Sequence, residues 1–251
     1  MKTKLVSQPA NRYGKRQKKM KHTVTTAITA CAGLAMLSAL LLVFMYAPVD
    51  ANMGVVQKIF YFHVSSAYTM YLSWFVCTIA SITYLAKRTE SSDMVAKSAG
   101  ELALVFAIIV MITGPLWGRK SWGAFWTWDP RLTSALLLTL IIVSYVLLRY
   151  LASGEVERRF AAALAIMGAC VVPLIHMSVY KWRGQHPTVI TQKGGGLDQD
   201  MWITFTVSLV AFSLFFVALL LRRYGLEENR RRLMELTEEA VAREIHIEAN
   251  R

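Results

Sequence analysis

The chain has 251 residues, of which 55% are hydrophobic, and its mean hydropathy is +0.40. Long uncharged apolar runs recur along it, which excludes an ordinary soluble domain and indicates an integral membrane protein. A net charge of +12 would suggest nucleic acid as the partner of a soluble protein. In a membrane protein, Lys and Arg instead gather in cytoplasmic loops, so we expect no nucleic-acid partner.

Six runs are long enough to cross a membrane as helices, which takes about 20 apolar residues. In chain order they cover residues 24–46, 64–86, 98–114, 132–148, 160–179 and 202–221. The first is too long for the apolar core of a secretory signal. The third is predicted to stop at Gly114 and Pro115, whereas neighbouring helices can accommodate Pro173 inside the fifth. The predicted fold class is therefore an all-α integral membrane protein with six transmembrane helices.

The distribution of Lys and Arg predicts the orientation. With the N-terminus inside, 21 of these residues fall on the inner side and seven in the outer loops 47–63, 115–131 and 180–201. Because cytoplasmic segments carry the excess, both termini are predicted to be cytoplasmic. The chain then divides into a basic cytoplasmic segment (1–22), a six-helix domain (23–223) and a cytoplasmic tail (224–251). In the tail, i,i+4 pairs such as Glu227 and Arg231 favour a short C-terminal helix.

The middle outer loop, 115–131, concentrates aromatic residues. Four of the seven tryptophans lie within twelve residues of it, at Trp117, Trp122, Trp126 and Trp128. An aromatic belt is the alternative interpretation, but a belt spreads Trp over all the helix ends. Gly118 and Gly123 alternate with the indoles, and glycine lets backbone approach a flat partner closely. Since indole offers a broad apolar face and one N–H donor, the loop is predicted to bind a large planar ligand.

Two histidines fall on the same predicted face as this loop. His63 lies at the outer end of the second span, and His186 lies in the third outer loop. Neutral imidazole is a natural axial ligand of haem iron, and two imidazoles complete a six-coordinate site. Zinc or copper usually takes three or four ligands, and the outer loops contain no Cys. We therefore predict haem b as the bound group, and a buried or supporting role for His176 inside the fifth span.

The end of the loop has both a structural and a ligand-binding interpretation. Asp129 before Pro130 is typical of a helix N-cap with Pro in the first turn, which would also fix the exit angle of the loop. Arg131 either pairs with a haem propionate through its guanidinium or is an ordinary solvated charge. Both Asp129 and Arg131 are included in the predicted haem-binding set.

The run 117–129 resembles the tryptophan-rich WWD signature of the haem-handling superfamily of cytochrome c biogenesis. Chain length, six spans and the order His, Trp loop, His resemble the CcmC family, the haem exporter protein C, over most of the chain. Ser65 stands where that family often has Pro, and Phe125 where a further Trp is common. The resemblance implies that His63 and His186 are the axial haem ligands and that the Trp loop cradles the macrocycle.

The resemblance also implies a haem-handling subunit that is not an enzyme, and the chain contains no Walker A sequence. Its implied partners are the membrane and ATPase subunits of an ABC-type haem-release complex, a periplasmic haem chaperone and membrane lipid. The implied location is a bacterial inner membrane, with the haem site on the periplasmic side. The alternatives are a permease for another planar solute and a structural subunit of a transporter complex.

Overall fold

The computed structural model describes residues 9–182, 186 and 196–248, and this part of the chain is helical without a β-strand. The helices are α1 (Pro9–Leu41), α2 (Ile59–Lys87), α3 (Glu90–Trp122), α4 (Pro130–Leu151), α5 (Glu155–Lys181) and α6 (Gln199–Glu248). A π-helical turn, η1 (Leu42–Tyr46), continues α1, and a 3-10 turn, η2 (Val55–Lys58), precedes α2. Six helices in the described ranges are long and apolar enough to span a membrane, which confirms the predicted fold class.

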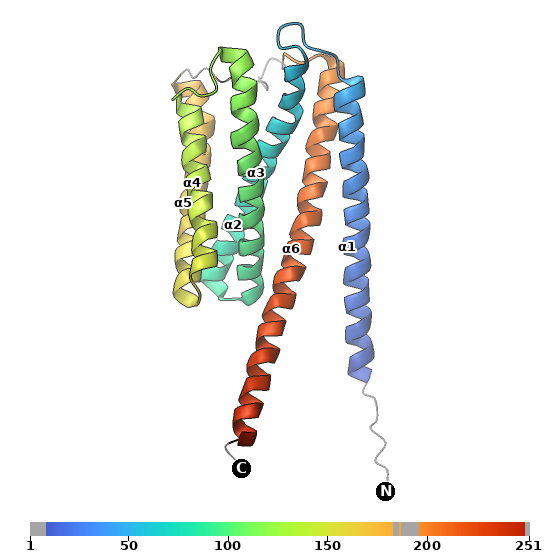
Figure 1. The fold of residues 1–251 in the computed structure, drawn as a ribbon, viewed down its shortest axis with the longest axis vertical. Coiled ribbons are helices and arrows are strands. Elements are labelled where there is room, and N and C mark those ends of the chain that lie inside the picture. Colours follow the sequence, from blue (N-terminus) through green and yellow to red (C-terminus); the bar gives the residue numbers. More distant parts are fainter. Residues whose placement is uncertain (1–8, 183–185, 187–195, 249–251) are drawn as a thin grey trace.

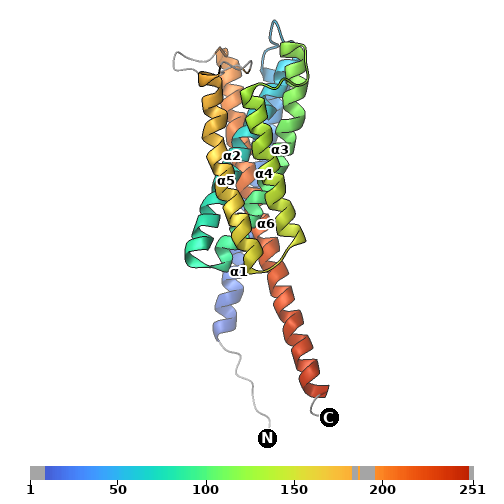
Figure 2. The same ribbon diagram turned by 90° about the vertical axis from the view of Figure 1, so that its left-hand side faces the viewer.

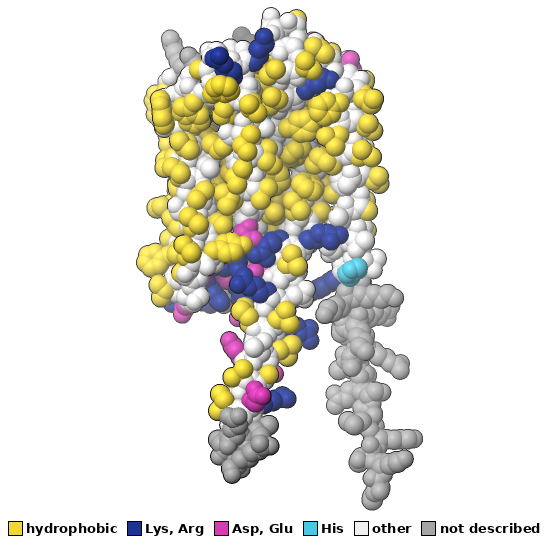
Figure 3. Space-filling model, viewed as in Figure 1, with side chains coloured by type: hydrophobic (Ala, Val, Ile, Leu, Met, Phe, Trp, Pro, Cys, Tyr) yellow, Lys and Arg dark blue, Asp and Glu magenta, His cyan; other side chains and the backbone are white. Residues whose placement is uncertain are grey.

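The helices form one elongated bundle with both termini at the same end (Figures 1 and 2). Helices α2 to α5 pack together, α6 packs against α2 and α3, and α1 packs against α6 at the edge (Figure 1). Apolar side chains cover the middle of the visible face, and Lys and Arg gather toward the two ends (Figure 3). A lipid bilayer solvates such a continuous apolar band, whereas a soluble protein would have to cover it.

Glycines allow the closest helix contacts in the buried core. Trp74 of α2 packs against Gly168 of α5, where an added Cβ would lie 2.6 Å from the indole Nε1. Tyr145 of α4 packs against Gly100 of α3, where a Cβ would overlap the phenol ring. Small residues at such crossings let large aromatic side chains of the facing helix fill the core, which is common in membrane bundles.

Helix α3 does not end at Gly114 and Pro115, and the prediction of its end was wrong. The helix continues through Pro115 to Trp122, so Trp117 and Gly118 are helical and the connecting loop proper is 123–129. Proline removes one backbone donor and crowds the preceding turn, but the packing of neighbouring helices makes this tolerable within a membrane bundle.

The residues of the predicted C-terminal helix are helical and form the end of α6. This helix continues past Gly225 to Glu248 without a break and extends beyond the bundle (Figure 1). A glycine inside a helix costs about 1 kcal/mol relative to alanine. Ion pairs of Glu227 with Arg223 and Arg231 bridge successive turns across this point. Helix α6 therefore runs on through residue 224, and α1 begins at Pro9, within the predicted basic segment.

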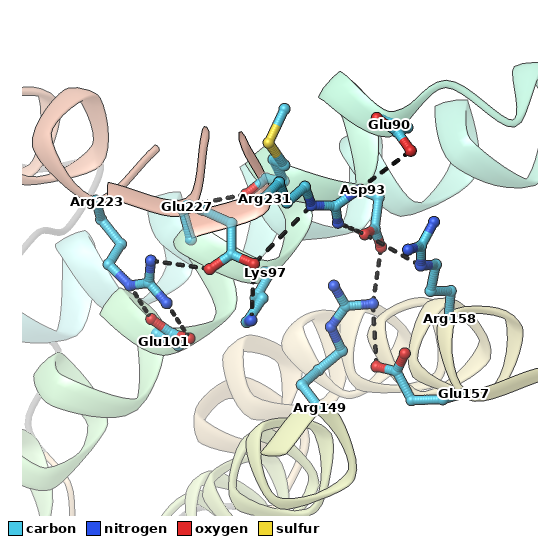
Figure 4. Close-up of polar contacts among 12 residues, drawn as sticks. Glu90, Asp93, Lys97, Glu101, Arg149, Glu157, Arg158, Arg223, Glu227 and Arg231 are labelled. Atoms are coloured by element: carbon cyan, nitrogen blue, oxygen red, sulfur yellow. Dashed lines mark hydrogen bonds and ion pairs between the residues drawn. The ribbon is translucent and has the colours of Figure 1, made fainter. Parts of the chain in front are cut away.

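Five acidic and five basic side chains form an ion cluster where α6 leaves the bundle (Figure 4). Its members are Glu90, Asp93, Lys97, Glu101, Arg149, Glu157, Arg158, Arg223, Glu227 and Arg231. The Asp93 carboxylate accepts from Arg149 Nη1 at 2.7 Å and also pairs with Arg158 and Arg231. Glu227 accepts from Lys97 Nζ at 2.9 Å. The cluster thus joins α6 to α3, and through Asp93 to α4 and α5.

Candidate functional site

A cavity lies at the end of the bundle opposite the termini, between α2, α3, α4 and α5. The empty space between its walls is about 740 Å³, which includes open solvent. Six of the ten predicted binding residues line it, namely His63, Trp117, Trp122, Trp126, Arg131 and His186. Four do not: Gly118, Gly123, Trp128 and Asp129. Tyr71 and Gly114, which were not among the predicted binding residues, also line it.

His63 lies near the start of α2, and its half-buried ring contacts α3. A Cβ at Gly114 would lie 3.1 Å from His63 Cε1, so the absence of a side chain there makes room for the imidazole. Nδ1 of His63 lies 2.9 Å from Thr113 Oγ1. Neither neighbour was predicted, because a Thr-Gly pair inside an apolar run is ordinary for a membrane helix.

Trp117 and Trp122 form an aromatic wall on the last turns of α3. Their rings pack edge to face with centroids 5.9 Å apart, and the centroid of Trp122 lies 6.1 Å from that of His186. A Cβ at Gly118 would lie 2.9 Å from Trp122 Cζ3, so glycine lets this indole fold back over the helix. Gly123 has φ 78° and ends α3 in a left-handed conformation that favours glycine. Both glycines therefore shape the wall, although neither lines the cavity.

The loop after α3 places Trp126 in the cavity wall and Trp128 outside it. The Trp126 Nε1 is buried and has no hydrogen-bond partner among the residues that the structure describes. Trp128 is 76% exposed and packs edge to face against Trp126, with centroids 5.7 Å apart. Trp128 can therefore support the wall from behind, but it does not contact the space in front of it.

Asp129 caps α4, as predicted. Its Oδ1 accepts from the backbone N–H of Arg131 at 3.0 Å and of Leu132 at 2.9 Å, with Pro130 as the first helical residue. This cap fixes the start of α4, and the side chain of Arg131 reaches the cavity from its first turn. Asp129 is thus a structural residue of the site, since it does not line the cavity.

His176 is exposed on α5, which contradicts the buried role among the two predicted for it and leaves the supporting role. Its Nδ1 lies 3.1 Å from the Val172 carbonyl oxygen of its own helix, and its ring packs on Tyr71 with centroids 5.2 Å apart. The adjacent Ile175 lines the cavity instead. Because successive helical residues point about 100° apart, a histidine one position further points away from the cavity. Of the third outer loop, residues 183–185 and 187–195, including Arg183 and Lys193, lie outside the described residues.

Fold and site together define a polytopic helical membrane protein with an aromatic cavity and two histidines at one end. The model of the family described as Heme exporter protein C matches residues 9–239. The chain belongs to this family. It is similar to Heme exporter protein C of Bradyrhizobium diazoefficiens, with 37% identity over 76% of this chain and 73% of the relative. It is also similar to the proteins of that name from Rhodobacter capsulatus (32% identity; 83% and 88%) and Escherichia coli K12 (29%; 72% and 74%).

Proposed function

We propose that this chain holds haem at the cavity end of the bundle as a membrane subunit in haem export for cytochrome c biogenesis. Membership of the Heme exporter protein C family supports the role in haem export. The observation that carries the site assignment is that one cavity is lined by both His63 and His186 together with three tryptophans. A subunit of this kind presents its cargo and performs no bond chemistry, so we assign it no enzymatic activity.

The residues of the cavity fit a haem b molecule as cargo. A porphyrin is a broad apolar disc with an iron at its centre and two propionates on one edge. The neutral imidazoles of His63 and His186 would bind the iron from opposite faces. The indoles of Trp117, Trp122 and Trp126 would pack on the disc, since indole favours flat apolar partners. The empty space between the walls, about 740 Å³, includes open solvent, so a bound macrocycle would be exposed on one side.

One donor in the cavity suits the propionates. Arg131 lines it and can bind a carboxylate with two parallel N–H groups. We assign the remaining predicted residues, Gly118, Gly123, Trp128 and Asp129, to shaping this wall.

We infer that the cavity faces the periplasm of a bacterial inner membrane. The support is the charge distribution, because 21 of the 28 Lys and Arg residues belong to segments 1–22, 87–97, 149–159 and 222–251, whose described parts lie at the opposite end (Figure 1). A periplasmic haem chaperone would then receive haem at the cavity. The membrane and ATPase subunits of an ABC-type complex would bind elsewhere on the chain, and membrane lipid would surround the apolar band.

Haem content distinguishes this function from the alternatives. Purified from haem-replete cells in mild detergent, the chain is expected to carry stoichiometric haem with the absorption spectrum of six-coordinate iron bound by two imidazoles. A permease for another planar solute or a purely structural subunit would be purified without haem. Protein that is purified without haem and binds none on titration with haemin would contradict the proposal.

The orientation is tested with reporters fused to the two ends of the bundle. Alkaline phosphatase, which is active only in the periplasm, is expected to be active when inserted at Gly196 and inactive when fused after Glu248. A fluorescent protein that folds only in the cytoplasm should give the reciprocal pattern at both positions. Phosphatase activity at the Glu248 fusion, with none at Gly196, would reverse the proposed topology.

A further inference from the structure

Thr113 of α3 makes two hydrogen bonds, and together they define the protonation of His63. Its Oγ1 lies 2.7 Å from the carbonyl oxygen of Ile109, one turn earlier in the same helix. A carbonyl oxygen can only accept, so the single hydroxyl proton of Thr113 is donated there. Oγ1 also lies 2.9 Å from His63 Nδ1, which must therefore be the donor in that contact. The geometry assigns the ring proton of His63 to Nδ1.

A neutral imidazole with its proton on Nδ1 has its lone pair on Nε2. We propose that Thr113 is a positioning residue that holds His63 with Nε2 available to haem iron; this inference rests on the proposed function. Metal-binding histidines commonly donate their other ring N–H to an oxygen acceptor, which fixes the tautomer and the ring orientation. Gly114 leaves room for the ring in this position, since a Cβ there would lie 3.1 Å from Cε1.

The contact with His63 distinguishes Thr113 from threonines of the bundle that bond only within their own helix. Hydroxyl donation to the carbonyl four residues earlier is common here; for example, Thr83 Oγ1 donates to Ile79 O at 2.8 Å. Such a bond alone is a local helical feature with no bearing on a ligand. Thr113 makes the same bond and also accepts from a histidine 50 residues away that lines the cavity.

His176 shows that a proton on Nδ1 does not by itself make a histidine an iron ligand, because the ring must also lie in the cavity wall. Its Nδ1 lies 3.1 Å from the Val172 carbonyl oxygen, so it too carries its proton on Nδ1. Its ring does not line the cavity, however, so it is not placed to bind the same iron. Among the described histidines, His63 combines an oxygen acceptor at Nδ1 on a neighbouring helix with a position in the cavity wall.

The test compares Thr113→Val, which keeps the shape but removes the acceptor, with Thr113→Ser, which keeps the acceptor. The valine variant is expected to bind haem about 10- to 100-fold more weakly, as for other lost partners of metal-bound histidines. Because the Nδ1–H bond makes the imidazole a stronger electron donor, its loss should also raise the midpoint potential of the bound haem. The serine variant should have the haem affinity and the midpoint potential of the wild type.

Thr83→Val is the matched control, since it loses the same local bond and should leave affinity and potential unchanged. If Thr113→Val also leaves both unchanged, Thr113 has no positioning role. Should the valine variant not be recovered from membranes, Thr113→Ala is judged by the same two measurements. If instead His63→Ala retains the wild-type haem spectrum, the ligand assignment itself fails, which is a different outcome from an unchanged Thr113→Val.

Discussion

Replacement of His63 by alanine is expected to abolish stoichiometric haem binding and cytochrome c maturation. The variant removes one of the two proposed iron ligands, an imidazole that lies between α2 and α3. The loss should exceed the roughly 10- to 100-fold effect of removing a partner of a ligand. Haem content of the purified protein, its absorption spectrum and the yield of mature c-type cytochrome in cells measure the effect.

Three comparisons make this expectation specific. His186→Ala should have the same effect, because it removes the second imidazole of the cavity. His176→Ala changes the same residue type near the same end of the bundle, but outside the cavity, and should leave haem content and spectrum unchanged. Added imidazole should partly restore the six-coordinate spectrum of His63→Ala, since it can occupy the vacated volume. Equal behaviour of all three alanine variants would contradict the assignment of the ligands.

Replacement of Arg149 by methionine is expected to destabilise the bundle strongly. Arg149 Nη1 contacts Asp93 at 2.7 Å and Glu157 at 3.1 Å, and the three side chains are only 5%, 2% and 7% exposed. Removing one partner of a buried ion pair leaves uncompensated charge and costs about 3–5 kcal/mol. For a chain of this size, the melting temperature of the detergent-solubilised protein should fall by on the order of 10 °C. In this variant Asp93 retains its ion pairs with Arg231 and Arg158, so the uncompensated charge is mainly that of Glu157.

Arg159→Met is the matched control for this variant. Arg159 pairs with Glu155, but these side chains are 54% and 57% exposed. Solvated pairs of this kind contribute about 0–1 kcal/mol, so the melting temperature should change little. If Arg149→Met and Arg159→Met both have the melting temperature of the wild type, the cluster does not hold α3, α4 and α5 together.

The two substituted residues, His63 of α2 and Arg149 of α4, have partners at opposite ends of helix α3, namely Thr113 and Asp93. Helix α3 carries Asp93, Lys97 and Glu101 of the ion cluster near its start, and Thr113 and the Trp wall near its end. The cluster also fastens α6 to this helix through Arg223 and Arg231. Separate measurements of melting temperature and haem affinity therefore distinguish a loss of scaffold from a loss of the site.

The sequence alone determined the features that depend on short stretches of chain. Hydropathy predicts the six spans because crossing a bilayer depends on the composition of about 20 neighbouring residues. The Asp129 cap of α4 was equally predictable, since its hydrogen bonds reach only two and three residues along the chain. The residue types that line the cavity, His63, His186 and three of the tryptophans, were also identifiable from their concentration near the outer helix ends.

The tertiary structure alone decided the features that depend on which helix faces meet. Continuation of α3 through Pro115 depends on neighbouring helices that tolerate a missing hydrogen bond. His63 and Thr113 are 50 residues apart, and Asp93 and Arg231 are 138 apart, so neither pair has a local signal. His176 looked like a buried histidine, but the rotation of α5 turns it outward. Local composition determines which segments enter the membrane, while packing determines where each side chain points and what it contacts.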